Sequence, residues 1–298
     1  MWQIIGAGAI GCLTAAHLLR TGEEVHLISR TPPFSTTLKF RDLQQQIAHY
    51  SISNSATLLN NRDPIIVCVK ATQVLQAIKQ HYNEISPSQL IILFHNGMGC
   101  AEEVRTILPN NPLICATTAN ASLQHRPFDI EQTGNGISCF GAFDSKSLPA
   151  TPLLTPLLNA LENSCLCDDI AKKLWLKLII NIAINPLTAL NQVKNGSLRK
   201  THFQDQIKEL VKECLLVTEK QGLVFFEDEL LTTINHVVSA TAKNFSSMNR
   251  DIFYQRQSEI DYINGYLIKK GAQHHIALPL ISSHYQRVKA SPHRSLIQ

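Results

Sequence analysis

The sequence predicts an α/β domain followed by an all-helical domain, and two observations carry this prediction. In the first half of the chain, short apolar runs alternate with helical segments, which is typical of a doubly wound parallel sheet with crossover helices. From Asp168 onwards the hydrophobic period becomes helical and stays so. We expect the domains over residues 1–166 and 167–298, because a chain of 298 residues is longer than one core usually supports.

The opening segment, residues 2–29, has the pattern of a strand, a glycine turn, a helix and a second strand. Its glycines have the spacing GxGxxG, directly after a short apolar strand. The first permits a tight turn, the second lets a pyrophosphate approach the backbone, and the third lets helix and strand pack closely. Free N–H groups at the helix N-terminus favour phosphate. We therefore expect a dinucleotide at Gly6, Ala7, Gly8, Ala9, Ile10 and Gly11.

The end of the second strand indicates which nicotinamide cofactor is used. An NAD enzyme usually places Asp or Glu there, whereas this chain has Ser29 and Arg30. An arginine at that point can hold a 2′-phosphate by charge-assisted hydrogen bonds, so NADP(H) is favoured. The alternative is that Arg30 is only a loop residue.

Two further strands end in polar residues. DPIIVCVK ends in Lys70, and QLIILFHN ends in Asn96 with a glycine loop after it. The carboxyl ends of parallel strands form the ligand-binding edge of an open sheet, so both residues are candidate cofactor or substrate contacts. We expect more strand at residues 113–118 and 134–143, with the parallel sheet ending near residue 145. Residues 31–63 show no site signature.

Residues 173–190 form a helix-length run that is apolar on nearly every face. Its interior polar residues are Lys177, Asn181, Asn185 and Thr188, and at about 100° per residue they lie within about 80° of one another. A helix that is apolar all round is buried, so this stripe predicts the wall of a polar pocket. The alternative is that Lys177 reaches the surface while the asparagines form hydrogen bonds with nearby backbone groups. We assign Thr188 to local hydrogen bonding, and expect Pro186 to kink or unwind the helix.

A buried lysine needs an anion. The best candidate is Glu259, because a helix over residues 249–271 would turn Asp261 away from it by about 200°. One loop earlier, Asn244, Ser246 and Ser247 offer polar groups, although Ser247 could equally cap the following helix. Further helices are expected over residues 204–220, 227–243 and 279–289.

Composition excludes several classes of protein. The formal charge is only +4 and no run of lysine or arginine is present, so a nucleic-acid partner is not expected. No apolar run of about 18 residues lacks a charge and no signal peptide fits before Trp2, which predicts a cytoplasmic protein without a membrane partner. The eight cysteines form no CxxC pair, and the CxC of Cys165 and Cys167 has no second ligand pair at metal-site spacing. We therefore expect reduced thiols and no metal.

Taken together, these segments resemble the ketopantoate reductase (2-dehydropantoate 2-reductase) family, NADPH enzymes of pantothenate synthesis and hence of the coenzyme A precursor. The resemblance runs nearly end to end. Its motifs are GAGAIG at 6–11, VKATQ at 69–73, HNGMG at 95–99, KLWLKLIINIAINPLTAL at 173–190, NG at 195–196, NFSSM at 244–248 and EIDYINGYL at 259–267.

The resemblance implies a Rossmann domain and a helical domain similar to that of 6-phosphogluconate dehydrogenase, with the active site in the cleft between them. It implies that Lys177 is the catalytic proton donor and that Glu259 contacts the cofactor ribose and organises the lysine. Lys70 and Asn96 would lie along the nicotinamide end of the cofactor. The substrate would be held by Asn181, Asn185, Asn195 and Ser247, with Asn244 nearby. The chain departs from the family at Asn120, where relatives often carry a histidine.

The expected reaction is reduction of ketopantoate to pantoate. Two alternatives stay open: a reductase of another branched 2-oxo acid, and a non-catalytic NADP(H) sensor. The sequence leaves open whether the protein is a monomer or a homodimer.

Overall fold

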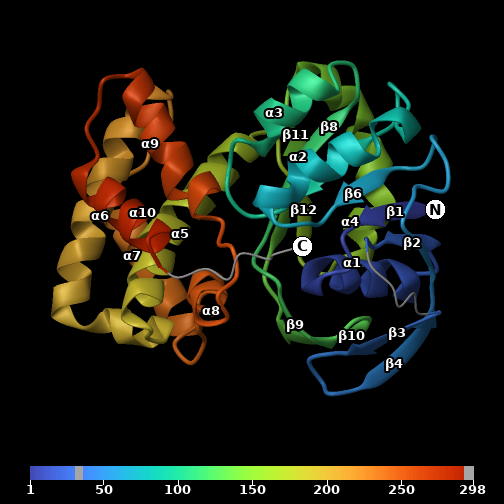
Figure 1. The fold of residues 1–298 in the computed structure, drawn as a ribbon, viewed down its shortest axis with the longest axis horizontal. Coiled ribbons are helices and arrows are strands. Elements are labelled where there is room, and N and C mark those ends of the chain that lie inside the picture. The colour runs from blue at the N-terminus through green and yellow to red at the C-terminus, as the bar shows by residue number, and fades with distance from the viewer. Residues whose placement is uncertain (31–35, 292–298) are drawn as a thin grey trace. The chain divides into compact units, whose positions relative to one another are not determined.

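The computed structural model describes residues 1–30 and 36–291. In it the chain divides into two compact units, Met1–Lys173 and Leu174–Gln298 (Figure 1). The division falls inside a long helix, α5 (Ile170–Asn191). The boundary expected from the sequence, between residues 166 and 167, lies just before that helix begins.

The first unit is built on an eight-stranded sheet in the order β12-β11-β8-β7-β6-β1-β2-β5. From β5 to β8, neighbouring strands pair in parallel. Strand β11 is antiparallel to β8, and β12 is parallel to β11. The predicted parallel sheet is confirmed, but it continues to residue 166 instead of ending near 145. The strands are β1 (Trp2–Ile5), β2 (Val25–Ile28), β5 (Ser53–Ser55), β6 (Ile65–Val67), β7 (Ile91–Phe94), β8 (Leu113–Thr118), β11 (Ser138–Ala142) and β12 (Ser164–Leu166).

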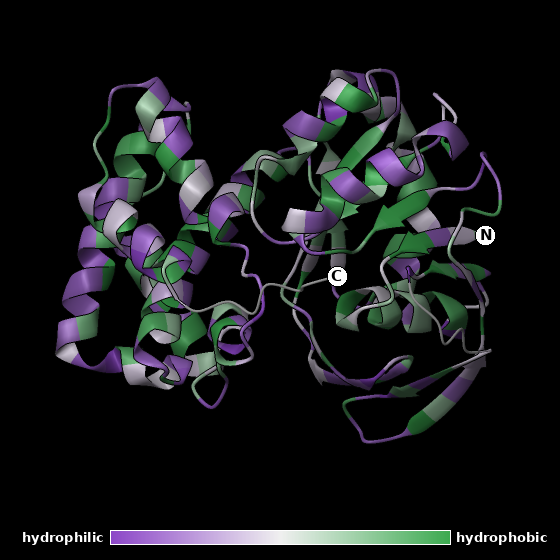
Figure 2. Ribbon diagram, in the orientation of Figure 1, coloured by the Kyte–Doolittle hydropathy of each residue, from purple (hydrophilic) through white to green (hydrophobic). Residues whose placement is uncertain are grey.

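The central strands β6 and β7 are continuous apolar runs because helices cover both faces of the sheet. Helix α1 (Ala9–Arg20) contacts α4 (Thr155–Ala160), and α2 (Ala71–Gln80) contacts α3 (Cys100–Ile107). Across the sheet, the step from β1 to β2 runs in the opposite direction to the step from β6 to β7. Right-handed crossovers therefore place the helix pair α1 and α4 on one face of the sheet and the pair α2 and α3 on the other. Figure 2 shows the strands as the hydrophobic centre of this unit. Short 3-10 segments lie at η1 (Tyr82–Glu84) and η2 (Ser145–Leu154).

A second, four-stranded sheet packs on α1 (Figure 1). Its order is β4-β3-β10-β9, and β3 pairs with β10 in parallel. Leu38, Phe40 and Ile130 point into the core shared with α1. The sequence analysis missed this sheet in the segment 31–63, of which residues 31–35 lie outside the described part. The strands are β3 (Thr37–Arg41), β4 (Ile47–Ser51), β9 (Ala121–Arg126) and β10 (Asp129–Gly134).

The second unit is helical, as predicted. Helix α5 is long and apolar enough to cross a membrane by length and composition alone, but 61% of its most apolar window is buried inside the protein. It is therefore the core helix of this unit. The other helices are η3 (Asn195–Arg199), α6 (Thr201–Lys220), α7 (Glu227–Ala240), α8 (Ser247–Phe253), η4 (Ile260–Tyr262), α9 (Asn264–Gln273) and α10 (Pro279–Lys289).

The single helix expected over residues 249–271 is wrong. Helix α8 ends at Phe253, where Gln255 takes a left-handed conformation with φ of 53°. The N–H of Arg256 then donates to the carbonyl oxygen of Asp251 at 2.7 Å, which closes the helix end. This geometry normally uses glycine, so the sequence carries no signal for the break.

Candidate functional site

The glycine turn after β1 is fixed by close packing at two of its three glycines. Gly6 has φ of +112°, and a Cβ on it would lie 2.7 Å from the carbonyl oxygen of Cys68. A Cβ on Gly11 would overlap the carbonyl oxygen of Gly6. Both positions therefore require glycine for the turn and helix α1 to pack against the sheet.

Gly8 is different, because nothing in the described chain lies within 4 Å of where its Cβ would be. It is the N-cap of α1 and has an extended backbone. The first turn of α1 carries no acidic side chain, so the free N–H groups and the helix dipole present positive potential there. Open space beside a helix N-terminus fits the phosphates of a dinucleotide, and Ala9 and Ile10 lie half-buried in the same turn.

The turn is also held from the second sheet. The Nε2 of Gln124, on β9, donates to the carbonyl oxygen of Ala7 at 2.9 Å. Sequence reasoning missed Gln124 because the contact joins residues 117 positions apart. The four-stranded sheet thus positions the glycine turn as well as packing on α1.

The other predicted cofactor residues follow strands next to β1. Arg30 is exposed just beyond β2, and the N–H of Ser29 donates to the carbonyl oxygen of Ser55 at 2.9 Å, which extends the β2–β5 pairing to its neighbour. Lys70 is half-buried at the N-cap of α2, after β6. Asn96 is half-buried after β7. Because β7, β6, β1 and β2 are parallel neighbours, these residues lie at the same sheet edge as the glycine turn.

Asn120, where the chain departs from the family pattern, hydrogen-bonds to three residues around the end of β8. Its Oδ1 accepts from the N–H of Gly136 at 2.8 Å, and its Nδ2 donates to Ser138 Oγ at 3.2 Å. Its own N–H donates to Thr118 Oγ1 at 2.9 Å. Asn120 therefore ties the end of β8 to the start of β11.

The polar stripe of the second unit lies on α5. Lys177 and Asn181 are half-buried, and Asn185 is 6% exposed. The helix continues through Pro186 to Asn191, so the expected local unwinding is absent. A proline removes a single N–H donor, and the burial of flanking Ile184 and Leu187 holds the helix together around it.

Thr188 has a larger role than the local hydrogen bonding expected for it. Its Oγ1 donates within the helix and also lies 2.7 Å from Ser246 Oγ. Ser246 caps α8 by accepting from the N–H of Asn249, whose Nδ2 donates to the carbonyl oxygen of Thr188 at 2.7 Å. This closed set of contacts joins the middle of α5 to the start of α8.

The capping residue of α8 is therefore Ser246 and not Ser247. Ser247 is the first residue of the helix and is exposed, so its hydroxyl is accessible to a ligand. Asn244, one turn earlier, is exposed as well.

Asn195 is brought against the loop that carries Asn244. Its N–H donates to the carbonyl oxygen of Asn244 at 2.9 Å, and its Nδ2 donates to Thr241 Oγ1 at 2.9 Å. Asn195 is 7% exposed, yet its Oδ1 accepts no hydrogen bond from any described residue. A buried acceptor without a donor costs about 1–3 kcal/mol.

Glu259 is buried directly before η4, and Asp261 lies within η4. Asp261 accepts from Tyr285 Oη at 2.7 Å and from Lys289 Nζ at 3.0 Å. Ser258, beside Glu259, is a residue that the sequence analysis missed. It is fully buried, and within the described chain its Oγ has no hydrogen-bond partner.

The beginning of α5 lies against α9, which follows Glu259 in the chain. The rings of Trp175 and Tyr266 are 5.8 Å apart between centroids. Two residues after Trp175 comes Lys177. Within this unit the helix that carries Lys177 thus packs against α9 through an aromatic pair.

Comparison with known proteins finds relatives that match nearly the whole chain. Family models for ketopantoate reductase PanE/ApbA match residues 2–145 and, for its C-terminal part, residues 169–291. A 2-dehydropantoate 2-reductase of Vibrio cholerae is 34% identical over 286 residues, which is 96% of each chain.

Solved structures extend the comparison to the fold. A PanE/ApbA family ketopantoate reductase from Ralstonia eutropha matches with a TM-score of 0.87 at 25% identity, over 97% of both chains. A D-mandelate dehydrogenase in complex with NADH and anilino(oxo)acetate matches with a TM-score of 0.88 over 98% of both chains. Its identity is 21%, so this second likeness concerns the fold alone.

Proposed function

Because the chain belongs to the ketopantoate reductase family, we propose that it reduces ketopantoate to pantoate with NADPH, in the synthesis of pantothenate. The observation that carries the proposal is the end-to-end likeness to a 2-dehydropantoate 2-reductase at 34% identity. The glycine turn supports the cofactor class, since Gly8 leaves open space at the N-terminus of α1.

Reduction of a 2-oxo acid adds a hydride to the ketone carbon and a proton to its oxygen. The bound cofactor supplies the hydride. The Lys177 ammonium polarises the ketone oxygen and then gives it a proton, so that the product is a neutral hydroxyl. Glu259 contacts the cofactor ribose and provides the negative charge that positions this lysine.

The amides hold the rest of the substrate. Asn181 and Asn185 lie one and two turns beyond Lys177 on the same face of α5, where they hydrogen-bond the carboxylate and the distal hydroxyl. Asn195 lies against the loop that carries Asn244, and the exposed Ser247 and Asn244 complete the set. A site that pairs with a substrate hydroxyl discriminates strongly against analogues that lack it.

Cofactor choice follows from Arg30, which we propose binds the 2′-phosphate of NADPH. Arg30 is exposed beyond β2, so its guanidinium is accessible to such a group. Lys70 and Asn96 lie at the same sheet edge and contact the nicotinamide end. Substrate, product and cofactor are all water-soluble metabolites, which supports a cytoplasmic location.

The test is a panel of branched 2-oxo acids with the purified protein and NADPH, followed by the loss of NADPH absorbance. Ketopantoate should give the highest kcat/KM, with an analogue that lacks the distal hydroxyl far lower. A higher kcat/KM for another acid would make the protein a reductase of that acid. Tight NADPH binding with no oxidation by any acid would identify a sensor.

A further inference from the structure

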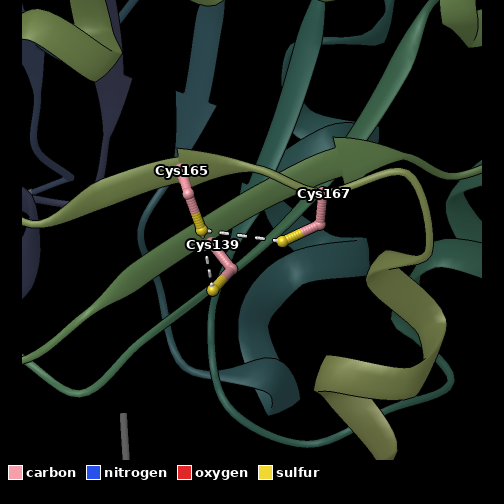
Figure 3. Close-up of side chains that lie close together, drawn as sticks. All are labelled: Cys139, Cys165 and Cys167. Atoms are coloured by element: carbon pink, nitrogen blue, oxygen red, sulfur yellow. Dashed lines mark hydrogen bonds between the residues drawn. The ribbon is translucent and has the colours of Figure 1, made fainter.

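Three cysteines gather at the edge of the eight-stranded sheet, away from the glycine turn. Figure 3 shows Cys139 on β11, Cys165 on β12 and Cys167 just beyond β12, with their sulfurs turned toward one another. The Sγ of Cys165 lies 3.4 Å from that of Cys139 and 3.7 Å from that of Cys167. All three sulfurs lie within 4.8 Å of one another.

The fold itself brings these sulfurs together. Cys139 and Cys165 are direct partners in the parallel register of β11 and β12. Cys167 is two positions further along and therefore falls on the same face as Cys165. Its N–H donates to the carbonyl oxygen of Phe140 at 2.7 Å, which continues the strand pairing to this residue.

Close packing also fixes the segment after β12. A Cβ on Gly141 would lie 2.7 Å from the carbonyl oxygen of Cys167 and 2.6 Å from Cβ of Ile170. Glycine at 141 thus lets β11 lie directly against the linker that carries Cys167. The backbone that carries Cys167 is therefore fixed by packing against β11 before any ligand arrives.

We propose that Cys139, Cys165 and Cys167 form a binding site for a thiophilic divalent metal ion of the zinc and cadmium class. A metal–sulfur bond of about 2.3 Å places two sulfurs of a tetrahedron about 3.8 Å apart, close to the two separations observed here. Binding requires only small side-chain movements, since the backbone already sets the positions. Soft thiolate ligands select zinc-like ions over magnesium or calcium.

The surroundings fit a site with three protein ligands and one open position. Cys139 is buried, whereas Cys165 and Cys167 are half-buried, so one side of the cluster is accessible to an entering ion. Water completes the tetrahedron on that side. The sequence analysis expected no metal because it sought a second pair of ligands in the chain, while the third sulfur comes from a neighbouring strand.

The site lies next to the start of α5. Cys167 is followed by two residues and then by Ile170, where α5 begins. The side chain of Asp169 accepts from the N–H of Lys172 at 3.0 Å in the first turn of that helix. A bound ion therefore anchors the chain at the point where it leaves the first unit.

The primary test is titration of the reduced full-length protein with Cd²⁺, observed through the ultraviolet sulfur-to-cadmium charge-transfer band. We expect one ion per chain. The substitutions Cys139→Ser, Cys165→Ser and Cys167→Ser should each weaken binding at least about a hundredfold. The matched control is Cys115→Ser on β8, whose residue pairs with Gly141 but lies outside the cluster, and it should bind as wild type.

A second measurement needs no variant. Cd²⁺ should protect Cys139, Cys165 and Cys167 of the wild-type protein from alkylation, as mapped by mass spectrometry. The proposal would be overturned if Cd²⁺ gave no charge-transfer band with the reduced protein, or if it protected other cysteines instead. Formation of a disulfide between Cys139 and Cys165 in a protein whose reduced form takes up no ion would overturn it as well. These readouts do not involve the reductase activity, so the two proposals fail independently.

Discussion

Thr188 Oγ1 and Ser246 Oγ lie 2.7 Å apart, and this contact joins two segments that carry proposed substrate residues. Thr188 follows Asn185 on α5 by one turn, and Ser246 stands directly before Ser247. The hydroxyl pair is completely buried on the Thr188 side, so water does not compete for it. The geometry of the proposed substrate residues therefore depends on a pair that touches no substrate.

Replacing Thr188 by valine should lower the free energy of unfolding and make the loop at residues 244–247 less ordered. Loss of a buried hydroxyl contact costs about 1–3 kcal/mol of unfolding free energy. We expect KM for ketopantoate to rise several-fold while KM for NADPH stays unchanged. Thr188→Ser keeps the hydroxyl and should restore KM. An equal rise in both KM values would show that the effect is a general loss of folded protein.

Replacing Gly8 or Gly11 by alanine should affect different properties of the protein, cofactor affinity in the first case and stability in the second. Gly11→Ala places a Cβ against the carbonyl oxygen of Gly6 and should lower the unfolding free energy by about 3 kcal/mol or more. Gly8→Ala meets no described atom, so its stability in urea should match wild type while NADPH affinity falls sharply. Unchanged NADPH affinity in the folded Gly8→Ala protein would show that the phosphates of NADPH do not bind at this turn.

Lys177→Ala should lower kcat by about 10²–10⁴-fold, the usual contribution of a positioned general acid. NADPH binding, measured by fluorescence, should be retained because the lysine acts on the substrate oxygen. Lys173→Ala is the matched control, since it removes an exposed lysine one turn earlier on the same helix. Near wild-type turnover of Lys177→Ala would refute the assigned proton donor.

Arg30→Ala should affect the two nicotinamide cofactors unequally. A charged hydrogen bond contributes about 1.5–3 kcal/mol, so KM for NADPH should rise about ten- to hundredfold. KM for NADH should change little, because NADH lacks the 2′-phosphate. The ratio of the two kcat/KM values measures this preference, and an equal effect on both cofactors would exclude the phosphate contact.

Buried histidines should make the protein sensitive to acid. Burial, and after it the Arg20 guanidinium, lowers the pKa of His17 to about 4, and burial lowers the pKa of His284 to about 4. Both are neutral in the folded protein, whereas in the unfolded chain they gain a proton below about pH 6.5. Their stabilisation is therefore present above that pH and is lost as the pH falls toward 4.

Each of these histidines should remove about 2 kcal/mol of unfolding free energy between pH 7 and pH 5. Urea unfolding at the two pH values measures the loss. His17→Gln keeps an acceptor for the hydrogen bond from Arg20, at 3.0 Å in the wild type, and should reduce the loss by about half. A pH dependence that is unchanged in this variant would contradict the assignment.

The elements whose pattern lies within one short segment were predicted from the sequence. The β1–α1–β2 segment, the parallel strands and helix α5 follow from periodicity, because each carries its apolar pattern within its own short segment. The glycine turn is predictable from the spacing of its glycines, although Gly6 is required by packing against Cys68, just after β6.

Features set by distant pairings were missed. Strand β3 pairs with β10 across 90 positions, and Gln124 reaches Ala7 across 117. Likewise, Cys139 joins Cys165 only because β12 adds to the sheet beside β11. Gln255 ends α8 in a left-handed conformation that glycine normally adopts, so even a local break was not visible. The roles assigned to Lys177 and Glu259 rest on the family and remain predictions.

The four-stranded sheet has a consequence for how the protein is made. Strands β3 and β4 leave the ribosome as an isolated hairpin, which has marginal stability on its own. The edge of β3 is unpaired until residue 129 is synthesised, when the N–H of Lys39 finds the carbonyl oxygen of Phe128. An unpaired edge is a template for aggregation, and closure of a long loop is slow. The glycine turn likewise gains its hydrogen bond from Gln124 only after β9 has been made.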